Sequence, residues 1–170
     1  PGDVLYLRDL EQGLDQINRV PSSKAIMDVR PGEKPGGSEL VILDKRDDPW
    51  RVNAKYVYTG YKKAFEKRGN VTLEADDLFH ANDTWYVAYS GTTVANNVSM
   101  ITSVPYGYWL FSYQGSYSES LTQLTSTSDM FTRTASAQLS ASRLMFRDAV
   151  QKLKLEGSVA EKWNSRYINA

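Results

Sequence analysis

The sequence predicts a mostly β protein in which a short helix and a β-hairpin precede a series of antiparallel strands. Three observations predict it. Apolar residues recur at helical spacing only near the N-terminus, in residues 7–20. From Trp50 onward, long segments alternate apolar with polar residues between clusters of Gly, Asn and Asp, which is typical of strands joined by turns. No apolar run approaches the ~20 residues of a membrane-spanning helix, so a helical membrane protein is excluded.

The predicted helix covers Leu7–Arg19. Its apolar residues Leu10, Leu14 and Ile17 recur at spacings of three and four, which places them on one side, and Val20 extends the same stripe. Pro21 ends the helix, because the residue before a proline is disfavoured in the α region.

A β-hairpin is predicted next, with strands at Lys24–Arg30 and Glu39–Leu43 and a turn at Pro31–Gly37. We expect the apolar stripe of the helix to pack on the alternate residues Ala25, Met27 and Val29. The charged segment Lys45–Trp50 contains a proline and is the predicted linker to the following strands.

The clearest of the later strands is Trp109–Ser118. Its odd-numbered residues are mostly aromatic and its even-numbered residues mostly polar, so the strand has one face of each kind. Six further segments are predicted as strands: Arg51–Thr59, Asn70–Asp76, Thr84–Thr92, Val98–Val104, Ala135–Ser142 and Lys152–Lys162.

The alternation alone leaves two architectures open. A soluble antiparallel sheet buries its apolar face in a core, whereas a membrane barrel turns that face to lipid and its polar face to a lumen. Several segments exceed the ~9–11 residues that cross a bilayer at a tilt. Compact connections at Pro105–Tyr108 and Phe146–Gln151 also alternate with a looser polar one at Thr125–Asp129. Both features favour the membrane barrel.

Composition argues against several other classes of function. The 20 basic and 20 acidic residues cancel, so no global field attracts nucleic acid. With no cysteine and the single histidine His80, no triad or multi-His metal site can be assembled, and we expect His80 to be a turn residue. Glu74, Asp76 and Asp77 could form a carboxylate pair or a Ca²⁺ site, but a charged strand edge running into a turn is the simpler interpretation. We therefore expect no catalytic residues, metal or cofactor.

Four stretches resemble one known family, the outer-membrane transporters of two-partner secretion, called TpsB proteins. Residues 5–22 resemble the second helix of the family's second POTRA domain, and residues 27–42 the hairpin after it. Residues 103–120 are similar to a periplasmic turn and the strand leaving it, and residues 139–158 to the next such turn.

The resemblance implies the C-terminal part of a periplasmic POTRA domain at residues 1–46 and the first strands, about seven, of an outer-membrane β-barrel at residues 47–170. It implies a pore that exports an unfolded secreted partner, which would be an adhesin, a haemolysin or an inhibition toxin. The sequence lacks other parts of the family pattern, including the VRG[YF] loop motif, so we expect an internal piece of such a transporter. A passive porin-like channel and a soluble β-barrel binding module remain the rival hypotheses.

The candidate functional residues follow from this resemblance and from the alternation. The apolar residues on the outward face are expected to contact outer-membrane lipid. They are Trp109, Phe111, Tyr113, Tyr117, Leu153, Leu155 and Val159. The candidate partner-binding residues of the POTRA part are Lys24, Ile26, Met27, Asp28 and Arg30. The candidate pore-lining residues are Glu74, Asp76, Ser112, Gln114, Gln138, Lys152, Lys154 and Glu156.

Overall fold

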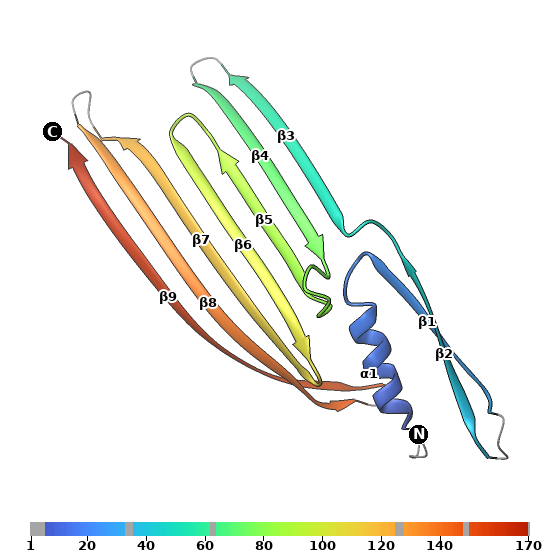
Figure 1. The fold of residues 1–170 in the computed structure, drawn as a ribbon. Helices are drawn as coiled ribbons and strands as arrows, with labels where there is room; N and C mark the ends of the chain where they lie inside the picture. Colours follow the sequence, from blue (N-terminus) through green and yellow to red (C-terminus); the bar gives the residue numbers. More distant parts are fainter. Residues whose placement is uncertain (1–5, 33–35, 62–63, 125–127, 148–149, 170) are drawn as a thin grey trace.

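The computed structural model describes residues 6–32, 36–61, 64–124, 128–147 and 150–169. Within these ranges the chain forms one helix, a two-stranded sheet and a seven-stranded antiparallel sheet (Figure 1). None of the described residues belongs to a helix long and apolar enough to cross a membrane. The predicted order of a helix, a hairpin and then a run of strands is therefore confirmed.

The helix α1 (Leu7–Ile17) is two residues shorter than predicted. It ends early because Asn18 is committed to the neighbouring strand. The Asn18 side-chain amide donates to the carbonyl of Ala25 (2.9 Å), and its oxygen accepts the Ala25 backbone N–H (2.6 Å). Asn18 thereby ties the helix C-terminus to the hairpin.

The hairpin consists of β1 (Ser23–Pro31) and β2 (Ser38–Arg46), which pair along their whole length. Val20 and Ala25 are buried between this hairpin and α1, at 2% and 6% exposure. Val29 is 51% exposed, so the expectation that it packs under the helix is wrong. The helix covers only the first residues of β1, since the hairpin extends away from it beyond that point (Figure 1).

The large sheet is a meander in which every strand pairs with its sequence neighbours. Each predicted strand overlaps one observed strand, and most observed strands are longer than predicted. The seven strands are β3 (Trp50–Tyr61), β4 (Ala64–Asp76), β5 (Thr84–Gly91), β6 (Ala95–Tyr106), β7 (Trp109–Gln123), β8 (Asp129–Arg147) and β9 (Lys152–Asn169).

The β4–β5 and β6–β7 connections and the adjoining ends of β8 and β9 lie at the end of the sheet near α1. The β5–β6 connection and the adjoining ends of β3 and β4, and of β7 and β8, lie at the far end (Figure 1). The β6–β7 turn has only two residues, and Gly107 supplies its left-handed conformation (φ 57°). A bulge at Met145 interrupts the β8–β9 register, and bulges bend strands. The nearby ends of β8 and β9 curve toward α1.

Candidate functional site

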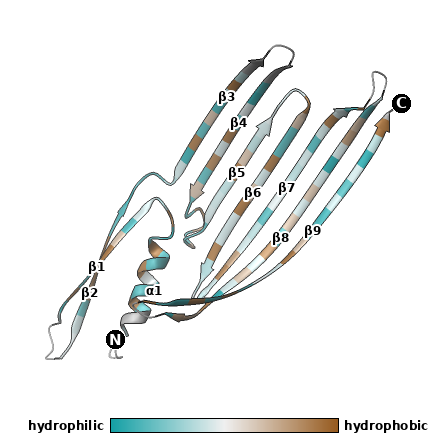
Figure 2. Cartoon of the chain, turned by 180° about the vertical axis from the view of Figure 1, so that it is seen from behind, coloured by the Kyte–Doolittle hydropathy of each residue, from teal (hydrophilic) through white to brown (hydrophobic). Residues whose placement is uncertain are grey.

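The large sheet has two chemically different faces. Residues opposite each other in the register share a face, so one row contains Glu74, Tyr86, Ile101, Gln114 and Gln138. We call the face of the sheet that contains this row the polar face. Figure 2 shows the hydrophilic and hydrophobic bands that alternate along the strands. The opposite face is called the apolar face and carries Val71, Val98, Phe111, Tyr113, Tyr117, Leu139, Leu155, Val159 and Trp163, all of which are substantially exposed or half-buried.

All the candidate pore-lining residues lie on the polar face, and all the residues expected to face lipid lie on the apolar face. Ser112 stands opposite Ser103 and Ser140, and Gln114 opposite Gln138. On β9, Lys152, Lys154 and Glu156 alternate with Leu153 and Leu155. The placement agrees with the alternation in the sequence, while the function of each face is a separate question.

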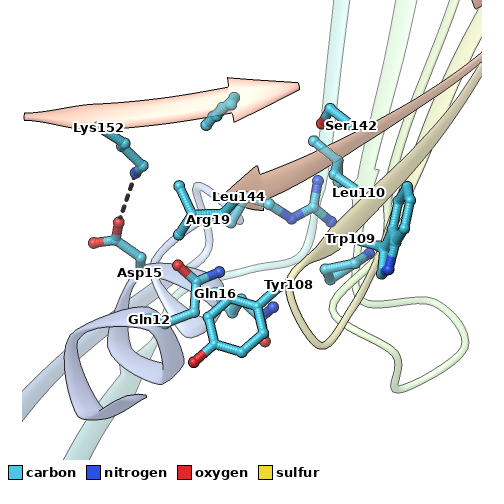
Figure 3. Close-up of a pocket in the computed structure, with 12 residues that line it drawn as sticks. Gln12, Asp15, Gln16, Arg19, Tyr108, Trp109, Leu110, Ser142, Leu144 and Lys152 are labelled. Carbon is cyan, nitrogen blue, oxygen red and sulfur yellow. Dashed lines mark hydrogen bonds and ion pairs between the residues drawn. The ribbon is translucent and has the colours of Figure 1, made fainter. Parts of the chain in front are cut away.

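The helix α1 docks against the polar face at the end of the sheet where β7 and β9 begin. A cavity of about 150 Å³ separates α1 from the strands and is lined by Gln12, Asp15, Gln16, Arg19, Leu110, Ser142, Leu144, Lys152 and Lys154, among others (Figure 3). Lys152 and Lys154 therefore lie beside the helix rather than in the middle of the sheet.

Acidic and amide side chains of α1 hold the turns of the sheet. Asp15 forms ion pairs with Arg147 and with Lys152 (Nζ–Oδ2 3.1 Å), the second of which is drawn in Figure 3. The Tyr108 hydroxyl donates to Asp9, and the Gln16 side-chain amide donates to the Gly107 carbonyl. The helix is thus attached to the β6–β7 turn and to the β8–β9 ends.

Arg19, which follows α1, attaches this part of the chain to the β4–β5 turn as well. Its guanidinium donates to Ser103 Oγ (2.7 Å) and to the Asn82 carbonyl, while the Asn82 side chain donates back to the Gln16 carbonyl. Burial lowers the pKa of Arg19, and the carboxylates of Asp83 and Asp76 oppose that shift. This turn requires three non-glycine residues in the left-handed region, Asp77, His80 and Asn82.

Asp83 fixes the shape of the same turn and is fully buried. It accepts the backbone N–H of Phe79 (3.1 Å) and the indole N–H of Trp85. Burial raises the pKa of Asp83, but these hydrogen bonds outweigh it and leave the pKa below its ordinary value. His80 is an exposed residue of this turn, as predicted.

A second joint connects the hairpin end to β3 and β4. The carboxylate of Asp76 accepts the Ser22 backbone N–H (3.0 Å) and a two-pronged pair of hydrogen bonds from Arg51 (2.8 and 3.0 Å). Arg51 also bonds Glu74 (2.8 Å). Asp76 is only 2% exposed, so the prediction that it lines an open pore surface is wrong: Ser22 and Arg51 cover it. Among the described residues no group of three or more His, Cys, Asp or Glu is arranged to hold a metal ion.

Comparison with known proteins identifies the family of this chain. The model of the haemolysin secretion/activation protein family ShlB/FhaC/HecB matches residues 36–170, and a POTRA-domain model matches residues 1–31. The chain belongs to the ShlB/FhaC/HecB family. This is the two-partner secretion family that the sequence resembles, and its members are transporters. The predicted mostly β fold, with a POTRA part before barrel strands, is confirmed.

Among the curated relatives are a transporter of the CdiB type and a hemolysin transporter. The outer membrane transporter CdiB of Dickeya dadantii is 31% identical over 99% of this chain and 32% of its own length. The hemolysin transporter protein HpmB of Proteus mirabilis is 34% identical over 69% of this chain and 22% of its own length. The chain thus spans about a third or less of the curated relatives it matches.

The structure of CdiB from Acinetobacter baumannii shares the fold, with a TM-score of 0.81 and 21% identity over 99% of this chain and 34% of that one. Membership of the family places the protein in the bacterial outer membrane, with the POTRA part in the periplasm. The turns that hold α1 are accordingly at the periplasmic end of the barrel strands.

The candidate partner-binding residues all lie on β1 of the POTRA part. Ile26 is 68% exposed and Met27 is half-buried. The charged residues of the set are paired locally: Lys24 with Asp47 (2.6 Å), and Arg30 with Asp28 (2.9 Å).

One edge of β1 pairs with β2. The hydrogen bonds between Asn18 and Ala25 show which residues of β1 direct their backbone N–H and C=O groups to the other edge. The backbone N–H and C=O of Ala25 both bind the Asn18 side chain, so these two groups are directed away from β2. Backbone direction alternates along a strand, so Met27 and Val29 also present their N–H and C=O groups to the outer edge. Ile26 and Asp28 instead point into the β1–β2 ladder.

We expect the attachment of α1 to weaken in acid. The hydrogen bond from Arg147 is the main reason that the pKa of Asp15 lies below its ordinary value; burial opposes the shift and Lys152 adds to it. A carboxyl whose pKa is lowered by docking favours the docked state above its free pKa, and that contribution is lost as pH falls through the docked pKa. Asp15 is 45% exposed, so screening keeps the contribution small.

Spin labels on Gln12 and Ser142 of the full transporter would measure this attachment as a distance distribution. It should be narrow at pH 7 and broaden below about pH 4, the region in which carboxylates take up protons. Asp15→Asn should be broader already at pH 7 and respond less to acid. An unchanged distribution in both experiments would show that Asp15 does not hold the helix.

Proposed function

We propose that the chain is part of an outer-membrane translocation pore that recognises an unfolded secreted partner protein and exports it by two-partner secretion. The observation that carries this proposal is a POTRA part fixed to barrel strands that have one polar and one apolar face. The transporter names of the relatives support it. A passive porin-like channel or a soluble β-barrel binding module would have no use for a periplasmic docking part.

In this proposal the polar face lines the pore and the apolar face contacts outer-membrane lipid. Glu74, Ser112, Gln114, Gln138 and Glu156 would form part of the pore wall. Lys152 and Lys154 would lie at its periplasmic mouth, since they line the cavity beside α1. The mixture of amides, hydroxyls and both signs of charge suits an extended polypeptide, which needs a wet channel without strong binding to any one segment.

The secreted partner would be a large adhesin, haemolysin or inhibition toxin. Transport would need no catalytic residue, nucleic acid or cofactor from this chain. Folding of the partner outside the cell would remove chain from the pore and oppose its return, which supplies a direction for the movement. We also propose the boundary between the two parts at residue 46, because β2 ends at Arg46 and β3 begins at Trp50.

Capture would occur along the outer edge of β1. A strand with free backbone groups binds an added strand through hydrogen bonds that demand little of its sequence. The edge donors would be the N–H groups of Met27 and Val29, with Ile26 as an exposed apolar contact. The local pairing of Lys24 and Arg30 leaves little net positive charge for acidic segments of the partner.

Proline substitution tests the capture step in the full transporter. Val29→Pro removes an edge donor and should reduce secretion and partner binding several-fold, whereas Val29→Ala keeps the N–H and should have little effect. Single-channel conductance should be the same for both variants, since the pore is untouched.

Asp28→Pro is the folding control. The backbone N–H of Asp28 points into the β1–β2 ladder, so Asp28→Pro should destabilise the hairpin and not only reduce capture. Normal partner binding and secretion by a folded Val29→Pro variant would contradict edge pairing. The groove between α1 and β1, or another domain, would then be the docking site.

A further inference from the structure

The apolar face contains an open hollow near the periplasmic ends of β6–β9. It has a volume of about 630 Å³ and is lined by Val104, Phe111, Tyr113, Leu139, Ala141, Gly157 and Val159, among others. This volume falls within the ~300–1,000 Å³ range typical of sites for small organic ligands. The hollow exists because two small residues, Ala141 and Gly157, stand opposite each other in the register.

One wall of the hollow continues into a charged group. The rings of Phe111 and Trp109 stack with centroids 5.9 Å apart and an interplanar angle of 11°. The Arg143 guanidinium lies over Trp109, 5.3 Å from its ring centroid. Trp109, Arg143 and Leu155 form one row of the register, and the next row toward the middle of the sheet is Phe111, Ala141 and Gly157.

Arg143 is exposed and forms no ion pair with the described residues. It differs in this from Arg133, the other arginine on the apolar face, which lies 3.8 Å from the Glu119 carboxylate near the far end of the strands. An unpaired guanidinium held over an indole at the periplasmic edge of an apolar surface is positioned for an anion located in the headgroup layer.

We propose that this is a binding site for one anionic phospholipid of the periplasmic leaflet. An acyl chain occupies the hollow over Ala141 and Gly157, and the phosphate accepts hydrogen bonds from Arg143. The chemistry that selects this occupant is the combination of an apolar hollow with a single cation at its headgroup end. The inference rests on the proposed function, in which the apolar face contacts lipid.

The site lies on the outer surface of the same strands whose polar face meets α1. Trp109, Leu110, Ser142 and Leu144 line the cavity beside the helix (Figure 3), and Phe111, Ala141 and Arg143, which neighbour them on the same strands, belong to the lipid site. A bound lipid would therefore stabilise the segment of β7 and β8 on which the POTRA part is docked.

Lipid binding can be measured on the full transporter, delipidated in detergent, with a single cysteine at Leu155 carrying a bimane fluorophore. Phosphatidylglycerol with brominated acyl chains is the probe. Quenching at Leu155 should saturate at a low lipid-to-protein ratio, whereas the same label at Leu73, elsewhere on the apolar face, should quench only as lipid accumulates.

Two variants should weaken the saturable quenching. Arg143→Gln should raise the half-saturating lipid concentration about tenfold, as expected for loss of one charge-assisted hydrogen-bond partner. Gly157→Leu should weaken it at least as much, because a Cβ at Gly157 meets no atom within 4 Å and the longer side chain fills the hollow. Gly69→Leu, at an equally open glycine on the apolar face, and Arg133→Gln are the matched controls and should leave binding unchanged.

The outcomes separate this inference from the proposed function. Equal, non-saturable quenching at Leu155 and Leu73, or no effect of Arg143→Gln and Gly157→Leu, would overturn the lipid site and leave the lipid-facing assignment intact. Absence of quenching at both positions after reconstitution into brominated bilayers would overturn both.

Discussion

Arg51→Met should destabilise the full transporter by ~1–3 kcal/mol, the usual cost of leaving a buried acceptor without its hydrogen-bond donors. The Asp76 carboxylate is 2% exposed in the structure, and the substitution removes its two guanidinium hydrogen bonds, which leaves the Ser22 backbone N–H as its partner. Because Ser22 belongs to the POTRA part, the loss should also loosen the connection between the two parts. Denaturant unfolding of the transporter from lipid bilayers measures the first effect.

Arg46→Met is the matched control. Arg46 is 65% exposed and bonds Asp44 and Asp77 at the surface, so its removal should cost little. A second comparison is Arg51→Met combined with Asp76→Asn, which removes the stranded charge and should recover part of the loss. If Arg51→Met and Arg46→Met had equally small effects, Asp76 would not be the joint between the parts.

Leu139→Arg should destabilise the barrel by ~2–4 kcal/mol if position 139 faces the middle of the bilayer. Leu139 is 63% exposed on the apolar face, so the described residues leave most of a side chain at this position open to its surroundings. Gln138→Arg introduces the same side chain one residue earlier, on the polar face, where water would solvate it. Because both variants introduce an arginine, the difference in their unfolding free energies measures the difference between the surroundings of the two faces.

Equal costs at positions 138 and 139 would show that the two faces meet similar surroundings, as in a soluble sheet with both sides wet. A larger cost for Gln138→Arg would invert the assignment. Only a selective cost at Leu139 agrees with a membrane barrel.

The strands could be predicted from the sequence because the signal is local. Alternation in Trp109–Ser118 assigns each residue to a face without knowledge of its neighbours, and the register then places Gln114 beside Gln138 as the alternation requires. The lengths were underestimated because the alternation weakens toward strand ends, as in residues 119–123 of β7 and 129–134 of β8.

The joints could not be predicted, because they connect residues that are distant in the sequence. Asp76 meets Ser22 and Asp15 meets Lys152 only after the strands have placed their turns beside α1. An acidic residue at the end of a strand gives no sign of whether it will line a pore or be buried under another part. The direction of the β1 backbone was equally hidden, since it depends on Asn18 binding Ala25 and not on side-chain alternation.

In the proposed function a secreted protein passes along the polar face. Photo-crosslinking side chains can be placed one at a time in the full transporter at Gln114 and Gln138, and at their apolar-face neighbours Tyr113 and Leu139. The secreted partner is then stalled in transit by a folded domain fused to its C-terminus. We expect adducts with the partner from Gln114 and Gln138 and none from Tyr113 and Leu139. Adducts from Tyr113 and Leu139, or no adducts from Gln114 and Gln138 while the partner is stalled, would contradict passage along the polar face.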